Sequence, residues 1–129
     1  MRDTFSVYPI GHSEMIDGQI AIRLTPEHRE GLGGLAEFSH AVALWWAHKT
    51  DSAELRARHT VASPYTATAD DFGVFSTRSE ARPNPIGLSV FSVAAVDQEA
   101  GILFSYYFDM LPETPILDIK PYFPASDLA

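Results

Sequence analysis

The pattern of apolar and polar residues along the chain is that of short β-strands. In residues 19–24 the apolar side chains of Ile20, Ile22 and Leu24 alternate with smaller or more polar ones, which is the pattern of a strand with one buried face. Further apolar stretches predict strands at residues 5–10, 38–48, 88–96, 102–108 and 116–120. Strands this short and closely spaced predict a mostly β domain, either a barrel or a sandwich.

The stretch at residues 38–48, FSHAVALWWAH, is apolar at nearly every position, so we expect both of its faces to be covered. Its content of Ala and Leu would also suit a helix. We assign a strand because Val42, Leu44 and Trp46 alternate with other residues, as side chains on one face of a strand do.

A turn at residues 97–101 is expected to join two strands into a hairpin,. In the second arm of this hairpin, Phe104, Tyr106 and Phe108 would place three aromatic rings on one face,. Exposed aromatic rings of this kind also predict an oligomer.

One segment has a helical signal and one has the signal of a loop. Thr25 would cap a helix whose first position is Pro26 and whose first turn contains Glu27,. Three glycines between residues 31 and 34 would keep this helix short. Residues 63–71 are polar and rich in Thr and Ala, which predicts a mobile loop,.

Composition limits the size of the molecule and its chemistry. With 129 residues, 46% of them hydrophobic, we expect one domain spanning residues 1–129. There are no cysteines, so disulfides and thiolate metal sites are excluded, and the histidines lack the spacing of a metal site. No apolar run approaches the roughly 20 residues of a membrane-spanning helix, and no signal peptide is evident. We therefore expect a soluble cytoplasmic protein.

The net charge of −8, from 9 basic and 17 acidic residues, argues against a generic nucleic-acid binder, because Lys and Arg supply the affinity for phosphates. Four of the nine basic residues nevertheless lie in one central span that also contains His59, namely Arg56, Arg58, Arg78 and Arg82. This span could form a local positive patch. Alternatively, its arginines pair with the acidic residues Asp70, Asp71 and Glu80,.

Two polar, Pro-rich turns contain residues that an ordinary loop does not need. The first reads FGVFSTRSEARPNPIGLSV and contains Arg78 and Arg82. Two prolines fix the backbone on either side of Asn84, and Gly87 permits close backbone approach,. Such a loop is stiff and carries two cations.

The second turn, ETPILDIKPY, leads into a strand on which Asp118 and Lys120 share one face,. Neither a GxGxxG sequence after a strand nor a P-loop is present. A Rossmann-type dinucleotide or S-adenosylmethionine site is therefore not supported.

Three blocks, GVFSTRS, RPNPIGLSV and TPILDIKPY, are similar to the signature blocks of the TrmO-like family of tRNA adenosine N6-methyltransferases. PIGHSE and GLAEFSHAVALWWAH extend the resemblance over most of the chain. The resemblance implies a single small β-barrel with short helical turns, which works as a homodimer with its cofactor site near the subunit contact. It implies S-adenosylmethionine as cofactor and, as acceptor, N6 of threonylcarbamoyladenosine at position 37 of tRNA.

The resemblance also implies two catalytic candidates. Asn84 would read the edge of an adenine or the amino-acid end of the cofactor, and the Asp118 carboxylate would accept or hold the proton at N6. Each has an ordinary structural alternative. Asn84 could stabilise a Pro-rich turn, and Asp118 could form a surface ion pair with Lys120.

A larger set of residues is implied to hold the cofactor. Arg78 and Arg82 would meet phosphate or the cofactor carboxylate, and Phe75 and Tyr122 would offer aromatic faces to the sulfonium. Orienting the acceptor in line with the methyl group would then supply most of the rate. The expected cofactor-binding residues are Phe75, Thr77, Arg78, Arg82, Pro83, Asn84, Pro85, Gly87, Ser89, His40, Asp118, Lys120 and Tyr122.

The chain departs from the family pattern in two places. YFDMLPETP at residues 107–115 has Pro112 and Glu113 where a Gly-x-Asp-x-Leu-Asp-Gly-Thr-Pro lead-in is expected. The chain also stops soon after Tyr122, without the C-terminal domain of longer members. Two alternatives to the tRNA enzyme follow: a methyltransferase that acts on a small molecule, and a noncatalytic barrel that binds S-adenosylmethionine as a sensor.

Overall fold

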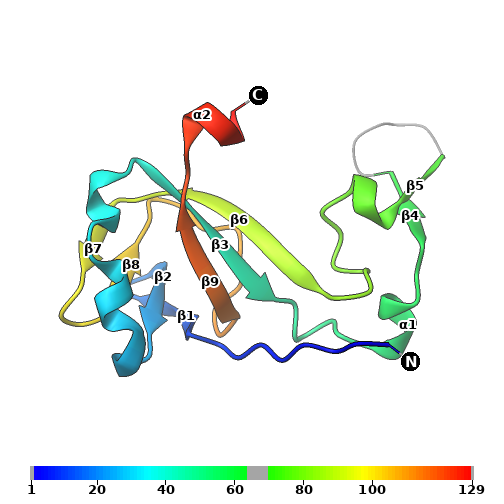
Figure 1. Ribbon diagram of the computed structural model, residues 1–129, viewed down its shortest axis with the longest axis horizontal. Coiled ribbons are helices and arrows are strands. Elements are labelled where there is room, and N and C mark those ends of the chain that lie inside the picture. Colours follow the sequence, from blue (N-terminus) through cyan, green and yellow to red (C-terminus); the bar gives the residue numbers. More distant parts are fainter. Residues whose placement is uncertain (1, 64–69, 129) are drawn as a thin grey trace.

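The computed structural model describes residues 2–63 and 70–128. Within them the strands are β1 Gly11–Ile16, β2 Gln19–Leu24, β3 His40–Trp46, β4 Thr60–Ala62, β5 Asp71–Gly73, β6 Ile86–Ser92, β7 Ala95–Asp97, β8 Ile102–Phe104 and β9 Pro115–Pro121. The helical segments are the 3₁₀ turns η1 Pro26–Leu32, η2 Leu35–Glu37 and η3 Val74–Ser76 and the short helices α1 Ala53–Arg56 and α2 Pro124–Asp127. A mostly β fold with short helical turns is therefore confirmed (Figure 1).

Seven strands form one antiparallel sheet in the order β6-β3-β9-β1-β2-β8-β7. The strands β4 and β5 pair separately as a hairpin, in a lobe of the molecule that also contains α1 and η3 (green in Figure 1). The edge strands β6 and β7 follow each other directly in the chain, so one stretch bends from one edge of the sheet to the other. In the described part of the chain no ladder joins these two edges. The sheet is open there, and a closed barrel is not confirmed.

The core lies on one face of this sheet, where alternate side chains of each strand point. On β3 the inward residues are Ala41 and Ala43, both fully buried, and Trp45, which packs against the core. Both η1 and η2 cover this face with a leucine each. Burying one large apolar side chain stabilises the fold by about 1.5–3 kcal/mol. The buried cluster contains Ile22, Leu24, Leu32, Leu35, Ala41, Ala43, Phe91, Leu103, Phe108, Met110 and Ile116.

The predicted first strand at residues 5–10 is wrong. The strand that pairs with β2 is β1, which starts at Gly11, and residues 2–9 are exposed and outside any strand. The position of β1 is set by the turn that joins β1 to β2, in which Asp17 and Gly18 have φ of 50° and 80°. These are the angles of a type I′ hairpin turn, which fixes the register of both arms. The prediction for residues 19–24 is confirmed by β2.

The predicted aromatic face on residues 102–108 is also wrong. The strand β8 ends at Phe104, because the Ser105 hydroxyl donates to Tyr107 O at 2.9 Å and accepts from Tyr107 N at 3.2 Å, which turns the chain. After this turn Tyr106 is 81% exposed, whereas Phe108 is 7% exposed and packs against Phe91 with the two rings tilted at 49°.

Other predictions hold with changed boundaries. The strands expected at residues 38–48 and 116–120 are β3 and β9, and the strand expected at 88–96 is divided into β6 and β7. A 3₁₀ turn, η1, begins at Pro26 as expected, but Thr25 makes no side-chain cap. Its hydroxyl contacts Ile10 O at 3.2 Å and His28 Nδ1 at 2.6 Å instead. Of the loop expected at residues 63–71, residues 64–69 lie outside the described residues, and Asp71 begins β5.

Candidate functional site

The loop between η3 and β6 is held in shape by its own hydrogen bonds. The buried Thr77 hydroxyl donates to Val74 O at 2.9 Å and accepts from Ser79 N at 3.1 Å. Arg82 Nη1 donates to Thr77 O at 3.3 Å and to Ser79 O at 2.6 Å. Thr77 and Arg82 therefore shape the loop, while Arg78 between them is exposed.

The Pro-rich part of this loop is attached to the end of β3. Pro85 is buried, and its carbonyl oxygen accepts from Ala47 N at 2.9 Å. Asn84 is exposed, and its carbonyl oxygen accepts from Ile86 N at 2.7 Å. The backbone of the Pro-Asn-Pro turn is thus fixed, as the two prolines predict, and the Asn84 side chain is presented at the surface together with Pro83.

Gly87 and Ser89, on β6, face the core rather than the surface. A Cβ at Gly87 would lie 2.3 Å from the Trp45 ring, so the glycine is needed to seat this indole. Ser89 is 1% exposed and accepts from Trp45 Nε1 at 2.9 Å. Its hydroxyl donates in turn to Asp109 Oδ1. Ser89 is buried and Gly87 is half-buried, and their expected direct contact with a cofactor stays a prediction.

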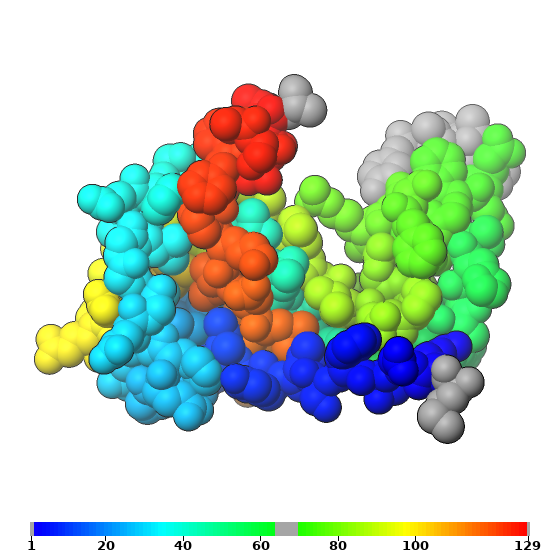
Figure 2. Space-filling model, in the orientation of Figure 1, coloured from blue at the N-terminus to red at the C-terminus, as the bar shows by residue number. Residues whose placement is uncertain are grey.

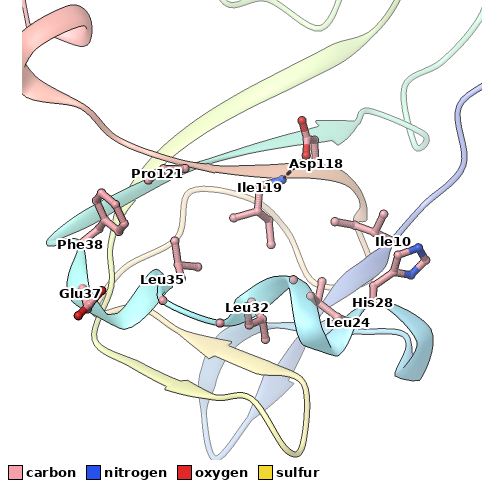
Figure 3. A pocket seen from close by; sticks show the side chains of 13 residues that line it. Ile10, Leu24, His28, Leu32, Leu35, Glu37, Phe38, Asp118, Ile119 and Pro121 are labelled. Carbon is pink, nitrogen blue, oxygen red and sulfur yellow. Dashed lines mark hydrogen bonds between the residues drawn. The ribbon is translucent and has the colours of Figure 1, made fainter.

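Asp118 and Lys120 lie on the outer face of β9. Asp118 Oδ2 pairs with Lys120 Nζ at 3.1 Å, and Asp118 Oδ1 accepts from Ile119 N at 2.9 Å. The Asp118 carboxylate lies on the opposite side of β9 from the Ile119 side chain (Figure 3). The prediction that Asp118 and Lys120 share one face is confirmed. Their ion pair is the surface pair that the sequence analysis gave as the structural alternative to a catalytic role for Asp118.

His40 and Tyr122 meet where β3 begins and β9 has ended. Tyr122 N donates to His40 O at 3.0 Å, and the two rings lie 6.3 Å apart between centroids. His40 Nδ1 contacts Ser39 Oγ at 3.0 Å, and the histidine is exposed. Both residues are therefore accessible from the end of the sheet at which α2 lies.

These positions divide the expected site into two groups beside β3. The loop group consists of Phe75, Thr77, Arg78, Arg82, Pro83, Asn84 and Pro85, beside the C-terminal end of β3. The strand group consists of His40, Asp118, Lys120 and Tyr122, along β3 from its N-terminal end as far as Leu44, the partner of Asp118. At about 3.3 Å per residue, the length of β3 places roughly 20 Å between His40 and the C-terminal end of the strand, but only about 7 Å along the strand between Leu44 and Trp46. His40 and Tyr122 are therefore far from the loop group, whereas Asp118 lies closer to it.

A cavity of about 440 Å³ lies under η1 and η2, on the inner face of β9 (Figure 3). Ile10, Leu24, Leu35 and Ile119 point into it, and Glu37 lies at its rim. Apart from Asp118, which also reaches the rim, none of the expected site residues lines this cavity. It is mainly an apolar space between the helical turns and the sheet.

A groove of about 590 Å³ crosses the outer face of the sheet and passes under the C-terminal segment. Figure 2 shows this side of the molecule hollowed between the C-terminal segment, red, and the lobe, green. The groove floor is apolar and its wall carries charges of both signs. The residues that line it are Val42, Leu44, Leu88, Lys120, Pro121, Phe123 and Asp127.

The central arginines have different surroundings. Arg56 donates to both oxygens of Asp51, at 2.7 and 2.8 Å, and lies 5.4 Å from the Trp46 ring centroid. The hydrogen bond from Arg56 lowers the pKa of the Asp51 carboxyl. Arg58 and Arg78 are exposed. The prediction that the central arginines form ion pairs therefore holds for Arg56, but its partner is Asp51 and none of the acidic residues named from the sequence.

Sequence reasoning missed a second cavity, beside the loop group. It lies where the segment after β3, the loop residue Glu80 and the lead-in to β9 meet, and it contains Asp109 and Trp45. Asp109 could have been noticed in the sequence, because it matches the first Asp of the family's lead-in to β9. Its contact with Ser89 could not be predicted, because the two residues lie 20 positions apart.

Two further findings concern metals and membranes. In the described residues, no three His, Asp or Glu side chains gather as a metal site would require. The helices in residues 2–63 and 70–128 are too short or too polar to span a bilayer.

The chain is similar to proteins of known name. A protein of Pyrococcus abyssi named as a probable S-adenosyl-L-methionine-binding protein is 38% identical over 120 residues, which is 93% of this chain and 61% of that protein. The tRNA (adenine(37)-N6)-methyltransferase of Mus musculus is 42% identical over 97 residues, which is 75% of this chain and 21% of the mouse protein. This chain therefore spans only part of the length of either relative.

Solved structures show the same fold. A crystal structure of TrmO superposes with a TM-score of 0.76 at 30% identity, covering 98% of this chain and 61% of that one. TrmO from Pseudomonas aeruginosa gives a TM-score of 0.73 at 30% identity, covering 98% of this chain and 60% of that one. The model of the family described as tRNA-methyltransferase O N-terminal domain matches residues 5–128. The chain therefore belongs to the TrmO N-terminal domain family, as its signature blocks indicate.

Proposed function

We propose that this protein is a cytoplasmic methyltransferase that uses S-adenosylmethionine to methylate N6 of threonylcarbamoyladenosine at position 37 of tRNA. The observation that carries the proposal is the match of the TrmO N-terminal domain family to residues 5–128, which contain both signature turns. The name of the mouse relative supports N6 of adenine 37 in tRNA as the acceptor atom, and the name of the P. abyssi relative supports the cofactor.

The described residues fit such a cofactor. S-adenosylmethionine has a zwitterionic amino-acid end, a cationic sulfur and an adenosine. Arg78 and Asn84 stand exposed on a loop that its own hydrogen bonds hold in shape, and Glu80 and Asp109 line the adjoining cavity. When bound, the cofactor supplies a methyl group on a sulfonium, which an acceptor nitrogen attacks.

The chain's own residues would orient the acceptor and hold its proton. Asn84 offers both a donor and an acceptor to the edge of an adenine. The accessible Asp118 carboxylate, half of a surface pair with Lys120, would accept the hydrogen at N6. Positioning would supply most of the rate, because little acid or base help is needed once the reacting atoms are aligned.

We also propose that the active form is a homodimer. His40 and Tyr122 of the strand group lie roughly 20 Å along β3 from the loop group,, whereas groups that act on one reacting centre must lie within a few ångströms of it. The outer face between them exposes Ile86, Leu88 and Val90 by 40%, 38% and 45%. A second copy placed on this apolar face by a two-fold axis would bring the loop group of one protomer to the strand group of the other.

The fold in this proposal is a small barrel. The sheet is bent toward closure because β6 and β7 are one nearly continuous stretch of chain that supplies both of its edges. A chain that passes from one edge to the other curves the sheet as a barrel requires.

The proposal is tested by transfer of a labelled methyl group from S-adenosylmethionine to tRNA that carries threonylcarbamoyladenosine, with nucleosides separated by mass spectrometry. We expect label on that nucleoside alone and none on tRNA without the modification. The tRNA interaction should also weaken steeply with salt. Cofactor binding without transfer to any tRNA would contradict the proposal and favour the small-molecule enzyme or the sensor.

A further inference from the structure

The cavity that adjoins the loop group contains charges of both signs. It has a volume of about 110 Å³ and lies between the segment that follows β3 and the lead-in to β9. Its apolar surface comes from Met110, Leu111 and the Trp45 ring, and its charged groups are Lys49, Glu80 and Asp109. The volume is well below the several hundred cubic ångströms of a pocket for a whole ligand. It therefore suits one polar end of a larger molecule.

The Asp109 carboxylate at this cavity is oriented from behind by two core residues. Ser89 is 1% exposed, and its hydroxyl accepts from Trp45 Nε1 at 2.9 Å. The single hydroxyl hydrogen is then donated to Asp109 Oδ1. Because the indole can only donate, this chain of bonds runs in one direction and ends on Asp109 Oδ1 as its acceptor.

A second carboxylate at the cavity is also held in place. Glu80 Oε2 accepts from Thr50 Oγ1 at 2.7 Å, and both residues line the cavity. Lys49 lies next to Thr50 in the chain and supplies the one ammonium in the lining. Two carboxylates and one ammonium around a small space complement a zwitterion, which carries one ammonium and one carboxylate of its own.

We propose that this cavity binds the amino-acid end of S-adenosylmethionine. The Asp109 carboxylate accepts from the α-ammonium of the cofactor, and Lys49 faces its α-carboxylate. Ser89 acts as a positioning residue, since it is buried and reaches the ligand only through Asp109. This inference rests on the proposed function, because it takes the cofactor from there.

The test compares two ligands that differ in the amino-acid end. S-adenosylhomocysteine carries this end, and 5′-methylthioadenosine lacks it, while both contain an uncharged sulfur and the adenosine. Their dissociation constants are measured by isothermal titration calorimetry with the wild-type protein and with Asp109→Asn, which keeps an oxygen for Ser89. Asp17→Asn, exposed in the β1–β2 turn, is the matched control.

We expect Asp109→Asn to weaken the binding of S-adenosylhomocysteine by about tenfold or more, as loss of a hydrogen bond between charged groups does. The binding of 5′-methylthioadenosine should be unchanged. Ser89→Ala should show the same selectivity with a smaller loss. A merely structural role for either residue would weaken both ligands together. Lys49→Ala, at an exposed position, tests the carboxylate end in the same way if a core variant does not fold.

The possible outcomes separate this inference from the proposed function. If the wild-type protein binds both ligands and the variants change neither, or change both equally, the assignment of the cavity is overturned and the cofactor proposal stands. If the wild-type protein binds neither ligand, both proposals are overturned. If the variants lose affinity for S-adenosylhomocysteine alone, the result supports both the assignment of the cavity and the cofactor proposal.

Discussion

Gly87 is a residue of the signature loop whose role is in packing. Its neighbour across the ladder is Trp45, and the indole ring occupies the space that a side chain at this position would need. The ring is fixed by its bond to Ser89. The glycine therefore supports the site indirectly, by allowing the Trp45–Ser89–Asp109 chain of hydrogen bonds to form.

Gly87→Ala should destabilise the protein. The new Cβ would lie 2.3 Å from the Trp45 ring, and relief of such overpacking costs about 1–3 kcal/mol. The free energy of unfolding in urea measures this loss. Gly31→Ala is the control, because nothing lies within 4 Å of its Cβ position. Equal stability of the two variants would show that the indole can move without cost.

Single residues were predictable where strand periodicity alone decides their place. Asp118 and Lys120 share a face because they lie two positions apart on β9. The burial of Ser89 also follows from alternation along β6, although sequence reasoning placed it at the cofactor. Asp109 could not be assigned, because its position depends on the Ser105 turn and on a partner in another strand.

At the scale of elements, the β1–β2 hairpin contains a charged pair on its surface. Glu14 Oε1 accepts from Arg23 Nε at 2.9 Å and from Arg23 Nη2 at 2.7 Å. The hydrogen bond from Arg23 lowers the pKa of Glu14 below its ordinary value. The ionised carboxylate is thus favoured in the folded state, so this pair stabilises the hairpin whenever Glu14 is charged.

Glu14→Gln should reduce stability at pH 7, and this reduction should disappear in acid. A lowered folded-state pKa gives a contribution that is present above the unfolded pKa and is lost as the pH falls through the folded value. Urea unfolding of wild type and variant between pH 7 and about 3 covers this window. Glu30→Gln, at an exposed position, is the control. A difference from wild type that does not change with pH would contradict the ion-pair account.

Elements were predictable where strands are long and strongly patterned, as β2, β3 and β9 are. The Asp-Gly turn that fixes the position of β1 is a known hairpin signal. The first strand was nevertheless predicted at residues 5–10, because these residues are more apolar than those of β1. The short strands β4 and β5 have three residues each, too few for any periodicity to appear. Their pairing depends on contacts within the lobe rather than on pattern.

At the scale of the whole molecule, charge is distributed unevenly. The net charge of the chain is −8, but five of its nine basic residues lie between residues 47 and 82, namely Lys49, Arg56, Arg58, Arg78 and Arg82. This span also contains five acidic residues, so its formal charge is zero and the acidic excess lies in the rest of the chain. A polyanion such as tRNA would meet the least repulsion at the lobe and the loop group, where the proposal places the acceptor.

The mostly β fold class could be predicted from the sequence, but the relative positions of the expected site residues could not. The signature blocks identify the family, yet the strands that they form, β6 and β9, lie on either side of β3 and not next to each other. Strand order in the sheet decides this separation, and no local pattern encodes strand order. The dimer that would reunite the two groups is likewise a property of a surface formed by β3, β6 and β9 together.

The most direct test of this account is complementation between two inactive variants. Arg78→Ala changes the loop group and Lys120→Ala the strand group, both at exposed positions. Methyl transfer to tRNA carrying threonylcarbamoyladenosine is measured for each variant alone and for the two co-expressed. If every site takes one group from each protomer, mixed dimers contain one intact site, and random pairing restores about a quarter of wild-type activity. Activity of the mixture no higher than that of the separate variants would contradict a site shared between two protomers.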